Sequence, residues 1–292
     1  MGLFLNIVLN GVSEGMVFAA IALGLVLVNR ATGIVNFAQG AMGMMTTFVA
    51  YSLLSGGIGY WPAFVVALAA GFFLGAAVEL IFIRPLQGKS PLNPVIVTIG
   101  LLVVLEGIAG SIWGVTSRGF PPAFSQRGLR FGSTRVAFST FDLFIVAAVI
   151  VLMAVMIAVF RWTDVGLRMR GAAFSPEVAR LLGVRVGRMF TLGWALAATA
   201  GALAGLLAAP ISSFGPYYMD LNLVYGFTAA VLGGLLSPVG ALVGGLVTGL
   251  CISLVGGYLG GNLAPLGALA LLLAVLMARP QGLFGSARAR RI

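Results

Sequence analysis

The sequence contains no histidine and only one cysteine, Cys251. Without histidine the chain cannot form a His-ligated zinc or haem site, an H-E-x-x-H protease centre or a His-based proton relay. A single cysteine cannot form an internal disulfide framework. These absences exclude several classes of metalloenzyme and the small disulfide-stabilised secreted folds.

Charged residues are also scarce. They make up 8% of the chain, whereas 60% of the residues are hydrophobic, and a soluble domain carries about 25% charged residues. The opening MGLFLNIVLNGV has no basic region or small-residue cleavage site, so we interpret it as mature sequence. The apolar residues form runs of the length that a helix needs to cross about 30 Å of hydrocarbon, whereas a β-barrel shows short alternating segments. We predict an all-α integral membrane protein with one transmembrane domain over residues 1–292.

The apolar runs define nine segments. They cover approximately residues 5–28, 41–54, 61–83, 94–113, 141–160, 189–209, 221–236, 241–258 and 263–278. The segments 41–54 and 221–236 are short for a full crossing. Backbone that is not helical survives at membrane depth only where protein or a wet cavity satisfies its polar groups. We therefore predict about 8–10 transmembrane helices, some of them broken or re-entrant.

The basic residues indicate the orientation and explain the net charge of +10. Most of them fall in the loop 84–89, the loop 161–188 and the tail that starts at Arg279. The positive-inside rule places these segments in the cytoplasm and leaves the loop 116–140 outside, where we expect a folded element. Because the charges sit between membrane spans, no nucleic-acid partner is predicted.

Glycine is abundant, with 42 residues, and several pairs have the G-x-x-x-G spacing that lets helix backbones approach closely in lipid. We interpret these pairs as helix-packing contacts. The stretches GIVNFAQG and VLGGLLSPVG interrupt apolar segments in the two ends of the chain. Paired interruptions are typical of transporters that are built from two related halves.

Catalytic sets are missing from the sequence. Gly88-Lys89-Ser90 resembles the end of a phosphate-binding P-loop, but Ile83 stands where that motif requires glycine. The chain has seven acidic residues, and only Glu106 lies well inside an apolar segment. Such a carboxyl group is either a packed structural group or part of a pathway. We predict that the chain is not an enzyme and binds no cofactor itself.

The loop 161–188 predicts a short exposed helix. Ser175 is a suitable N-cap, Pro176 suits the first turn, and Gly183 is a natural residue after the last turn. The predicted helix covers Pro176 to Leu182 and presents an apolar face beside Arg180. It is either an ordinary interfacial loop or a docking helix that fits a groove of a partner.

Several motifs of the chain occur together in one known family. They are GIVNFAQG, RPL at residues 84–86, AAFSPEVARLLGV, FTAAVLGGLLSPVGALVGGLVTG and RPQGLFG. With them the chain resembles, nearly from end to end, the inner-membrane permeases of ABC importers for branched-chain amino acids. The resemblance implies that the loop is a coupling segment that docks on an ATPase. The implied docking residues are Ala172, Ala173, Glu177, Ala179, Arg180, Leu181, Leu182 and Gly183.

The same resemblance implies a multi-pass permease subunit in the inner membrane of a prokaryote. Its expected partners are a second permease subunit, either a paralogue or a second copy, two cytoplasmic ABC ATPases that bind ATP and Mg²⁺, an external substrate-binding protein and the lipid bilayer. The expected substrate is a branched-chain amino acid, another amino acid, or urea or a small amide. The alternative is a stand-alone channel or an ion-coupled carrier, which normally needs groups organised around its ion.

The polar residues of the apolar segments are the candidates for the translocation path. They are Asn36, Gln39, Gly40, Glu106, Thr228 and Ser237. Amides suit a path that must pass a polar solute, because a fixed charge would hold the solute too tightly. The other interpretation of Asn36 and Gln39 is a polar hinge between two spans.

Overall fold

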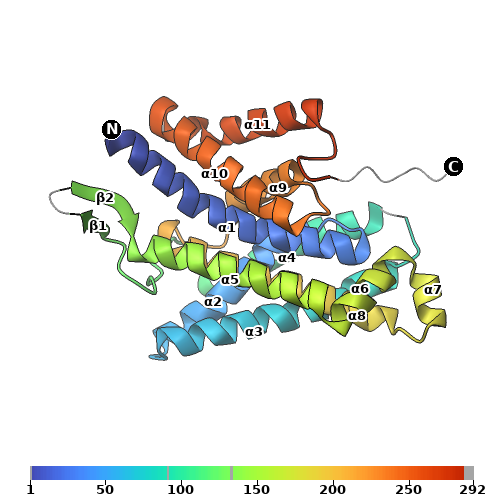
Figure 1. Cartoon of the computed structure of the whole chain (residues 1–292). Coiled ribbons are helices and arrows are strands. Elements are labelled where there is room, and N and C mark those ends of the chain that lie inside the picture. Colours follow the sequence, from blue (N-terminus) through green and yellow to red (C-terminus); the bar gives the residue numbers. More distant parts are fainter. Residues whose placement is uncertain (1, 91, 132–133, 286–292) are drawn as a thin grey trace.

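The computed structural model describes residues 2–90, 92–131 and 134–285, and its described part is a helical bundle with one small hairpin (Figure 1). Apolar runs with the composition of membrane helices form its long elements. The helices are α1 (Gly2–Thr32), α2 (Gln39–Ser55), α3 (Tyr60–Val78), α4 (Leu92–Trp113), α5 (Thr140–Trp162), α6 (Asp164–Phe174), α7 (Pro176–Leu181), α8 (Val186–Ala208), α9 (Asp220–Gly233), α10 (Pro238–Leu259) and α11 (Ala264–Ala278). The strands are β1 (Gly128–Phe131) and β2 (Thr134–Ser139).

The helices confirm the predicted fold class. In the described residues, seven helices are long and apolar enough to cross a membrane, namely α1, α3, α4, α5, α8, α10 and α11 with their short extensions. The two segments that are short in the sequence form α2, with 17 residues, and α9, with 14. Neither reaches the roughly 20 residues of a full crossing. Both are the broken elements that the sequence predicts.

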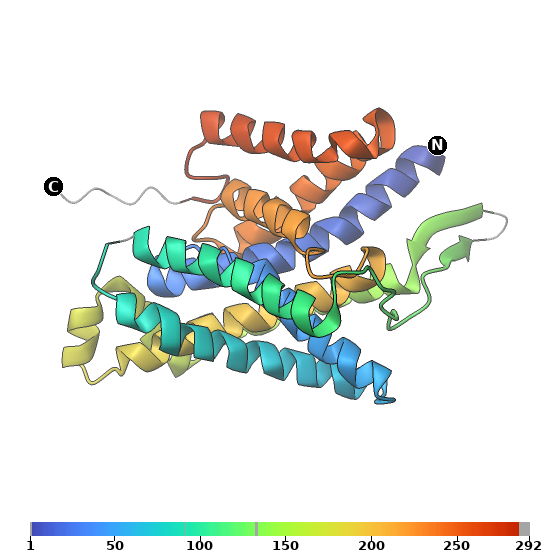
Figure 2. The ribbon, with the colours of Figure 1, turned by 180° about the vertical axis from the view of Figure 1, so that it is seen from behind.

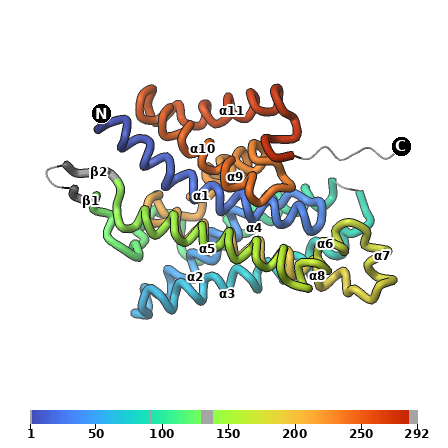
Figure 3. Tube along the Cα trace, in the orientation of Figure 1, coloured from blue at the N-terminus to red at the C-terminus, as the bar shows by residue number. Residues whose placement is uncertain are grey.

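The two ends of the bundle differ in charge. We call the end that holds residues 84–89 and 161–188 the arginine-rich end, and the end that holds residues 116–140 the hairpin end; they lie at opposite ends of the tube in Figure 3. Arg30, at the end of α1, lines a cavity with Lys89 at the arginine-rich end. The charge distribution predicts that this end faces the cytoplasm. The tail residues Arg288, Arg290 and Arg291 lie outside the described residues.

The helices form two halves of opposite direction. In each half a long helix is followed by a break, a short helix and two more helices, so that α1 to α4 correspond in order to α8 to α11. α1 runs from the hairpin end to the arginine-rich end, and α8 runs back (Figures 1 and 2). α1 packs most extensively against α10, and α8 packs most extensively against α3. This exchange is the arrangement of an inverted repeat.

The inverted repeat does not pair the two interruptions GIVNFAQG and VLGGLLSPVG that the sequence suggested. The break at residues 33–38 joins α1 to α2, and its counterpart in order is the segment 209–219 between α8 and α9. The predicted counterpart, VLGGLLSPVG, instead spans the end of α9 and the start of α10. Its counterpart in the first half is therefore the turn between α2 and α3.

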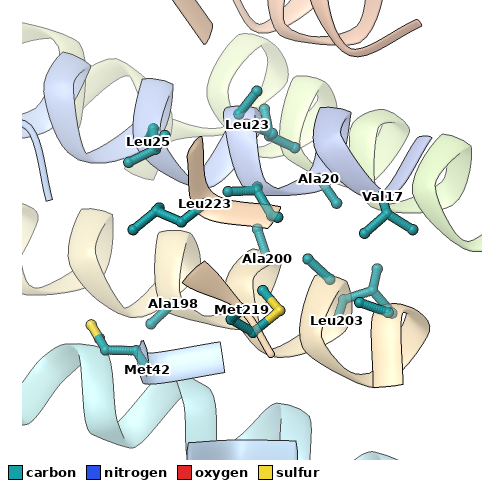
Figure 4. Close-up of a cluster of buried hydrophobic side chains, with 14 of the residues drawn as sticks. Val17, Ala20, Leu23, Leu25, Met42, Ala198, Ala200, Leu203, Met219 and Leu223 are labelled. Atoms are coloured by element: carbon teal, nitrogen blue, oxygen red, sulfur yellow. The ribbon is translucent and has the colours of Figure 1, made fainter. Parts of the chain in front are cut away.

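The centre of the bundle lies between α1, α8 and the two short helices. Figure 4 shows Val17 of α1 above Leu203 of α8, with Leu223 of α9 between the two long helices. In the most apolar stretch of α1, 89% of the residues are buried inside the protein. In the corresponding stretch that ends with α11, only 6% are buried. α1 is thus the central helix, and α11 lies at the periphery.

Small residues allow this close packing. A Cβ atom on Gly75 of α3 would stand 2.5 Å from the carbonyl oxygen of Trp194 in α8, and one on Gly201 would stand 2.6 Å from the amide nitrogen of Gln39. Both positions belong to predicted G-x-x-x-G pairs. Helix backbones approach this closely only where side chains are absent.

The loop 116–140 contains the expected folded element, an antiparallel hairpin of β1 and β2. Ser139 and Asp142 then start α5 with a reciprocal pair of hydrogen bonds: the Asp142 amide donates to the Ser139 hydroxyl, and the Ser139 amide donates to the Asp142 carboxylate at 2.7 Å. The Ser13 hydroxyl of α1 donates to the same carboxylate at 2.6 Å. The start of α5 is therefore fixed to α1 at the hairpin end.

Candidate functional site

The predicted coupling segment forms the helix pair α6 and α7 at the arginine-rich end. α7 covers Pro176–Leu181, and Gly183 follows it with a φ of 78°. The Gly183 amide donates to the Arg180 carbonyl at 3.0 Å, and the Val184 amide donates to the Ala179 carbonyl at 2.9 Å. These bonds close the helix as a glycine terminator does. Ser175 occupies the N-cap position, but its side chain makes no capping hydrogen bond.

The small residues of this segment face inward and the large ones face outward. Ala172 and Ala179 are buried in a cluster with Val186 and Phe190 of α8. Leu181 and Leu182 are 87% and 78% exposed. The remaining predicted docking residues, Ala173, Glu177 and Arg180, are half-buried or exposed. The segment thus combines an anchored side with a free apolar surface.

Phe174 belongs to this free surface and was not among the predicted docking residues. Its side chain is 87% exposed at the end of α6, and Val178 of α7 is 53% exposed. A signal existed in the sequence, because a lone phenylalanine directly precedes the Ser-Pro start of α7. We name the exposed residues Phe174, Val178, Leu181 and Leu182 the coupling surface.

A cavity of about 970 Å³ lies beside the coupling segment. It opens between the end of α1, the connection from α3 to α4, the start of α7 and the turn from α9 to α10. Its basic and acidic lining residues are Arg30, Lys89, Glu177 and Arg180. The cavity therefore brings the coupling segment next to the broken part of the bundle.

The side-chain amides of Asn36 and Gln39, in the break between α1 and α2, form hydrogen bonds within the protein. Asn36 and Gln39 are 0% and 1% exposed. The Asn36 Nδ2 donates to Gln39 Oε1 at 3.1 Å, and Asn36 Oδ1 accepts from the Ala38 amide at 3.0 Å. Gln39 Nε2 donates to the Ala197 carbonyl of α8 at 2.7 Å. In this conformation the two amides brace the hinge between α1 and α2 against α8.

Two of the predicted path residues meet at a small apolar cavity. Asn36 and Thr228 of α9 both line this space, which measures about 140 Å³. Its other lining residues are Leu25, Val35, Phe37, Leu223, Val224, Phe227 and Leu272. The Thr228 hydroxyl donates to the Val224 carbonyl of its own helix at 2.9 Å. Gly40 lies next to this place, because a Cβ atom on it would stand 3.1 Å from the Leu223 Cβ.

The last two predicted path residues lie elsewhere. Ser237 caps α10, where its hydroxyl accepts from the Gly240 amide at 3.0 Å. Glu106 of α4 lies close to Asp220 at the start of α9, and its Oε1 atom is buried without a hydrogen-bond partner. The sequence alone places no second acid beside Glu106, whereas the fold brings Asp220 next to it.

No group of three or more potential metal ligands occurs in the described part of the chain. Gly88 and Lys89 follow a 3₁₀ turn at Arg84–Leu86 and precede α4, with no strand before them. A P-loop would require a strand there.

The bundle of two inverted halves, with broken helices and an exposed helix pair at its basic end, is that of a multi-pass membrane protein. Comparison with known proteins gives the family. The model of the permease component of branched-chain amino acid transport systems matches residues 7–278. The chain belongs to this family.

The relatives cover almost the whole chain. It is 29% identical to the high-affinity branched-chain amino acid transport system permease protein LivH of Salmonella typhimurium, over 99% of this chain and 98% of that protein. It is 27% identical, over the same shares, to the permease protein BraD of the corresponding system in Pseudomonas aeruginosa. A metal-chelate type ABC transporter solved in an inward-facing conformation matches 95% of this chain and 88% of its own, with a TM-score of 0.50 and 17% identity. The fold is thus that of an ABC transporter permease.

Proposed function

We propose that this chain is the membrane-spanning subunit of an importer for branched-chain amino acids or a related small amino acid or amide, driven by a separate ATPase through alternating access. The observation that carries this proposal is the coupling surface. Phe174, Leu181 and Leu182 are large apolar side chains that stand exposed at the basic end of the bundle. An exposed apolar helix face of this kind fits a groove of a partner protein.

The anchoring of α7 supports its role in transmitting movement. Ala172 and Ala179 pack against Val186 and Phe190 in the first turns of α8. α8 continues into the centre of the bundle, where its Ala197 carbonyl accepts from Gln39. A partner that displaces α7 therefore acts on the helix that braces the first break. To shift a two-state equilibrium from 1:99 to 99:1, the partner must favour one state by about 5.5 kcal/mol.

We place the translocation path at the broken helices. The cavity shared by Asn36 and Thr228 lies where α1 gives way to α2 and where α9 packs. Its lining is apolar apart from these two side chains, which suits a solute with a hydrocarbon side chain. Gln39, Gly40, Glu106 and Ser237 act around this path by holding the helices that form it. ATP and Mg²⁺ bind to the partner ATPase in this scheme.

We infer the remaining partners by analogy with the family. A second permease subunit, either a paralogue or a second copy, completes the membrane part, and an external binding protein delivers the solute at the hairpin end. The alternative is a stand-alone channel or an ion-coupled carrier. The proximity of Glu106 and Asp220 favours this alternative, because acidic residues inside membranes often mark ion pathways.

Co-purification with the ATPase tests the proposal. The tagged chain is purified from membranes of its own host and is expected to retain an ABC ATPase. In a separate experiment, vesicles prepared from the same membranes are expected to take up leucine only when ATP is supplied. Gly183→Val forces a β-branched residue into a left-handed conformation. This variant is expected to lower both the amount of ATPase retained and the ATP-dependent uptake of leucine. Gly171→Val is the control, because a Cβ atom there meets nothing within 4 Å. Leucine uptake without any bound ATPase would instead establish the carrier.

A further inference from the structure

The arginine-rich end of α3 carries an ion pair whose carboxylate is buried and whose guanidinium group is half-buried. α3 continues into a π-helical turn at Glu79–Ile83 and a 3₁₀ turn that starts at Arg84. The Glu79 side chain is 0% exposed, and its Oε2 lies 3.0 Å from Arg84 Nη2. Gln87 Nε2 donates to Glu79 Oε1 at 3.2 Å. π-helical turns inside helices occur frequently at functional sites.

α8 supplies the other half of this arrangement. Arg84 Nη2 donates to the Thr191 hydroxyl oxygen at 2.7 Å and to the Gly187 carbonyl at 3.1 Å. The Thr191 hydroxyl in turn lies 2.7 Å from Glu79 Oε2, to which it can donate. The guanidinium group packs directly on Gly187, since a Cβ atom there would be in ordinary van der Waals contact with Arg84 Cζ at 3.5 Å. We name Glu79, Arg84, Gly187 and Thr191 the α3–α8 clasp.

The clasp resists separation of the two helices. If α3 moved away from α8, the buried Glu79 carboxylate would lose the Thr191 hydroxyl, and Arg84 would lose both of its acceptors on α8. A buried charge that loses its partners is strongly unfavourable. Within residues 2–90, 92–131 and 134–285, Glu79 and Arg84 form the only ion pair with atoms closer than 4 Å. Among the described residues, the ion-pair contribution to holding α3 against α8 therefore comes from this one site.

The clasp lies next to the coupling segment, at the start of α8. Gly187 is the second residue of α8, and the preceding residue, Val186, packs against Ala179 of α7. The Val184 amide also bonds to the Ala179 carbonyl. The chain therefore offers a continuous route from α7 through the first turn of α8 to Arg84 and α3. Along the rest of this contact, Gly71 and Gly75 hold α3 against α8.

We propose that the α3–α8 clasp transmits the displacement of α7 to α3, so that the two helices move as one unit when the partner ATPase closes. This inference rests on the proposed function. It assigns Arg84 and Thr191 as positioning residues for transport. α3 belongs to one inverted half and α8 to the other, so the clasp also links the halves.

The test measures coupling in the assembled complex. The chain, its second permease subunit and the ATPase are reconstituted in lipid vesicles with the external binding protein, and leucine transported is divided by ATP hydrolysed. Thr191→Val keeps the shape but removes the hydroxyl group. Because the Thr191 hydroxyl bonds to a charged group, its loss is expected to lower this ratio about tenfold. Thr191→Ser retains the hydroxyl group and is expected to restore the ratio to within twofold.

Thr199→Val is the matched control. Thr199 lies on the same helix, and its hydroxyl donates to the Ala195 carbonyl at 2.9 Å. This variant is expected to leave the ratio unchanged. If Thr191→Val does not assemble, Arg84→Lys is measured in the same way, because it keeps the charge but cannot reach all the acceptors of the guanidinium group.

The outcomes separate the two proposals. If wild-type chain binds no ATPase, the proposed function fails. If wild-type transport depends on ATP but Thr191→Val or Arg84→Lys lowers transport and hydrolysis in proportion, or changes neither, the clasp is only structural and the inference is wrong. A ratio that falls for Thr191→Val and returns with Thr191→Ser establishes the clasp as a coupling element.

Discussion

The brace formed by Gln39 predicts a large effect for one methyl group. In Gly201→Ala the new Cβ atom would stand 2.6 Å from Gln39 Nε2 and 3.3 Å from the Gln39 carbonyl oxygen. The far end of the Gln39 side chain must therefore shift, and because the Gln39 backbone carbonyl is also close, the shift weakens the 2.7 Å hydrogen bond to the Ala197 carbonyl. Overpacking a core costs about 1–3 kcal/mol, and a buried polar group without its partner costs about 1–3 kcal/mol. Because the two effects overlap, we expect a total near 2–3 kcal/mol.

The assay is thermal unfolding of the purified protein in detergent. For a chain of this size 1 kcal/mol corresponds to about 2–4 °C, so the melting temperature of Gly201→Ala is expected to fall by roughly 4–12 °C. Gly107→Ala is the control, because a Cβ atom there meets nothing within 4 Å and alanine favours the helix. The control is expected to melt at or slightly above the wild-type temperature. Equal melting temperatures for both variants would refute the brace.

Two further predictions concern the turns at the ends of α9. Ser237→Ala removes the side-chain cap of α10 and is expected to cost about 1 kcal/mol, which a melting curve detects as a shift of about 2–4 °C; an unchanged curve would mean that the cap adds nothing. Burial raises the pKa of Tyr218, whose hydroxyl lies 2.9 Å from Thr47 Oγ1. The neutral phenol therefore stabilises the fold fully below the unfolded pKa of about 10, and this contribution is lost as the pH rises further. Melting temperatures at alkaline pH should fall less steeply in Tyr218→Phe than in wild type, and equal slopes would contradict this assignment.

The sequence predicted most of the fold because the membrane imposes simple lengths. All nine apolar segments became helices, and the short segments 41–54 and 221–236 became α2 and α9. The end of α7 was predicted from Gly183, since a residue with positive φ at a helix end is usually glycine. Local rules therefore sufficed wherever the cause was local.

The parts that the sequence did not reveal depend on contacts between distant residues. Gln39 and Ala197 are 158 positions apart, and their bond shows that the polar break is braced inside the bundle. Glu106 and Asp220 likewise meet only after α4 and α9 fold together. The clasp was hidden for the same reason, because Arg84 reads as one more basic residue of a cytoplasmic loop until α8 brings Thr191 to it. Hydropathy and spacing carry no information on such pairs.

Site-directed cross-linking tests the central claim, that the coupling surface contacts the ATPase. Cys251 is replaced by alanine, and a single cysteine is introduced by Leu181→Cys on the coupling surface or by Ile58→Cys, an exposed position on the turn between α2 and α3. A short thiol cross-linker is then applied to native membranes. The account predicts that Leu181→Cys links to the ATPase subunit, that ATP changes the yield, and that Ile58→Cys gives no such product. Cross-linking from Ile58→Cys alone, or from neither position, would contradict it.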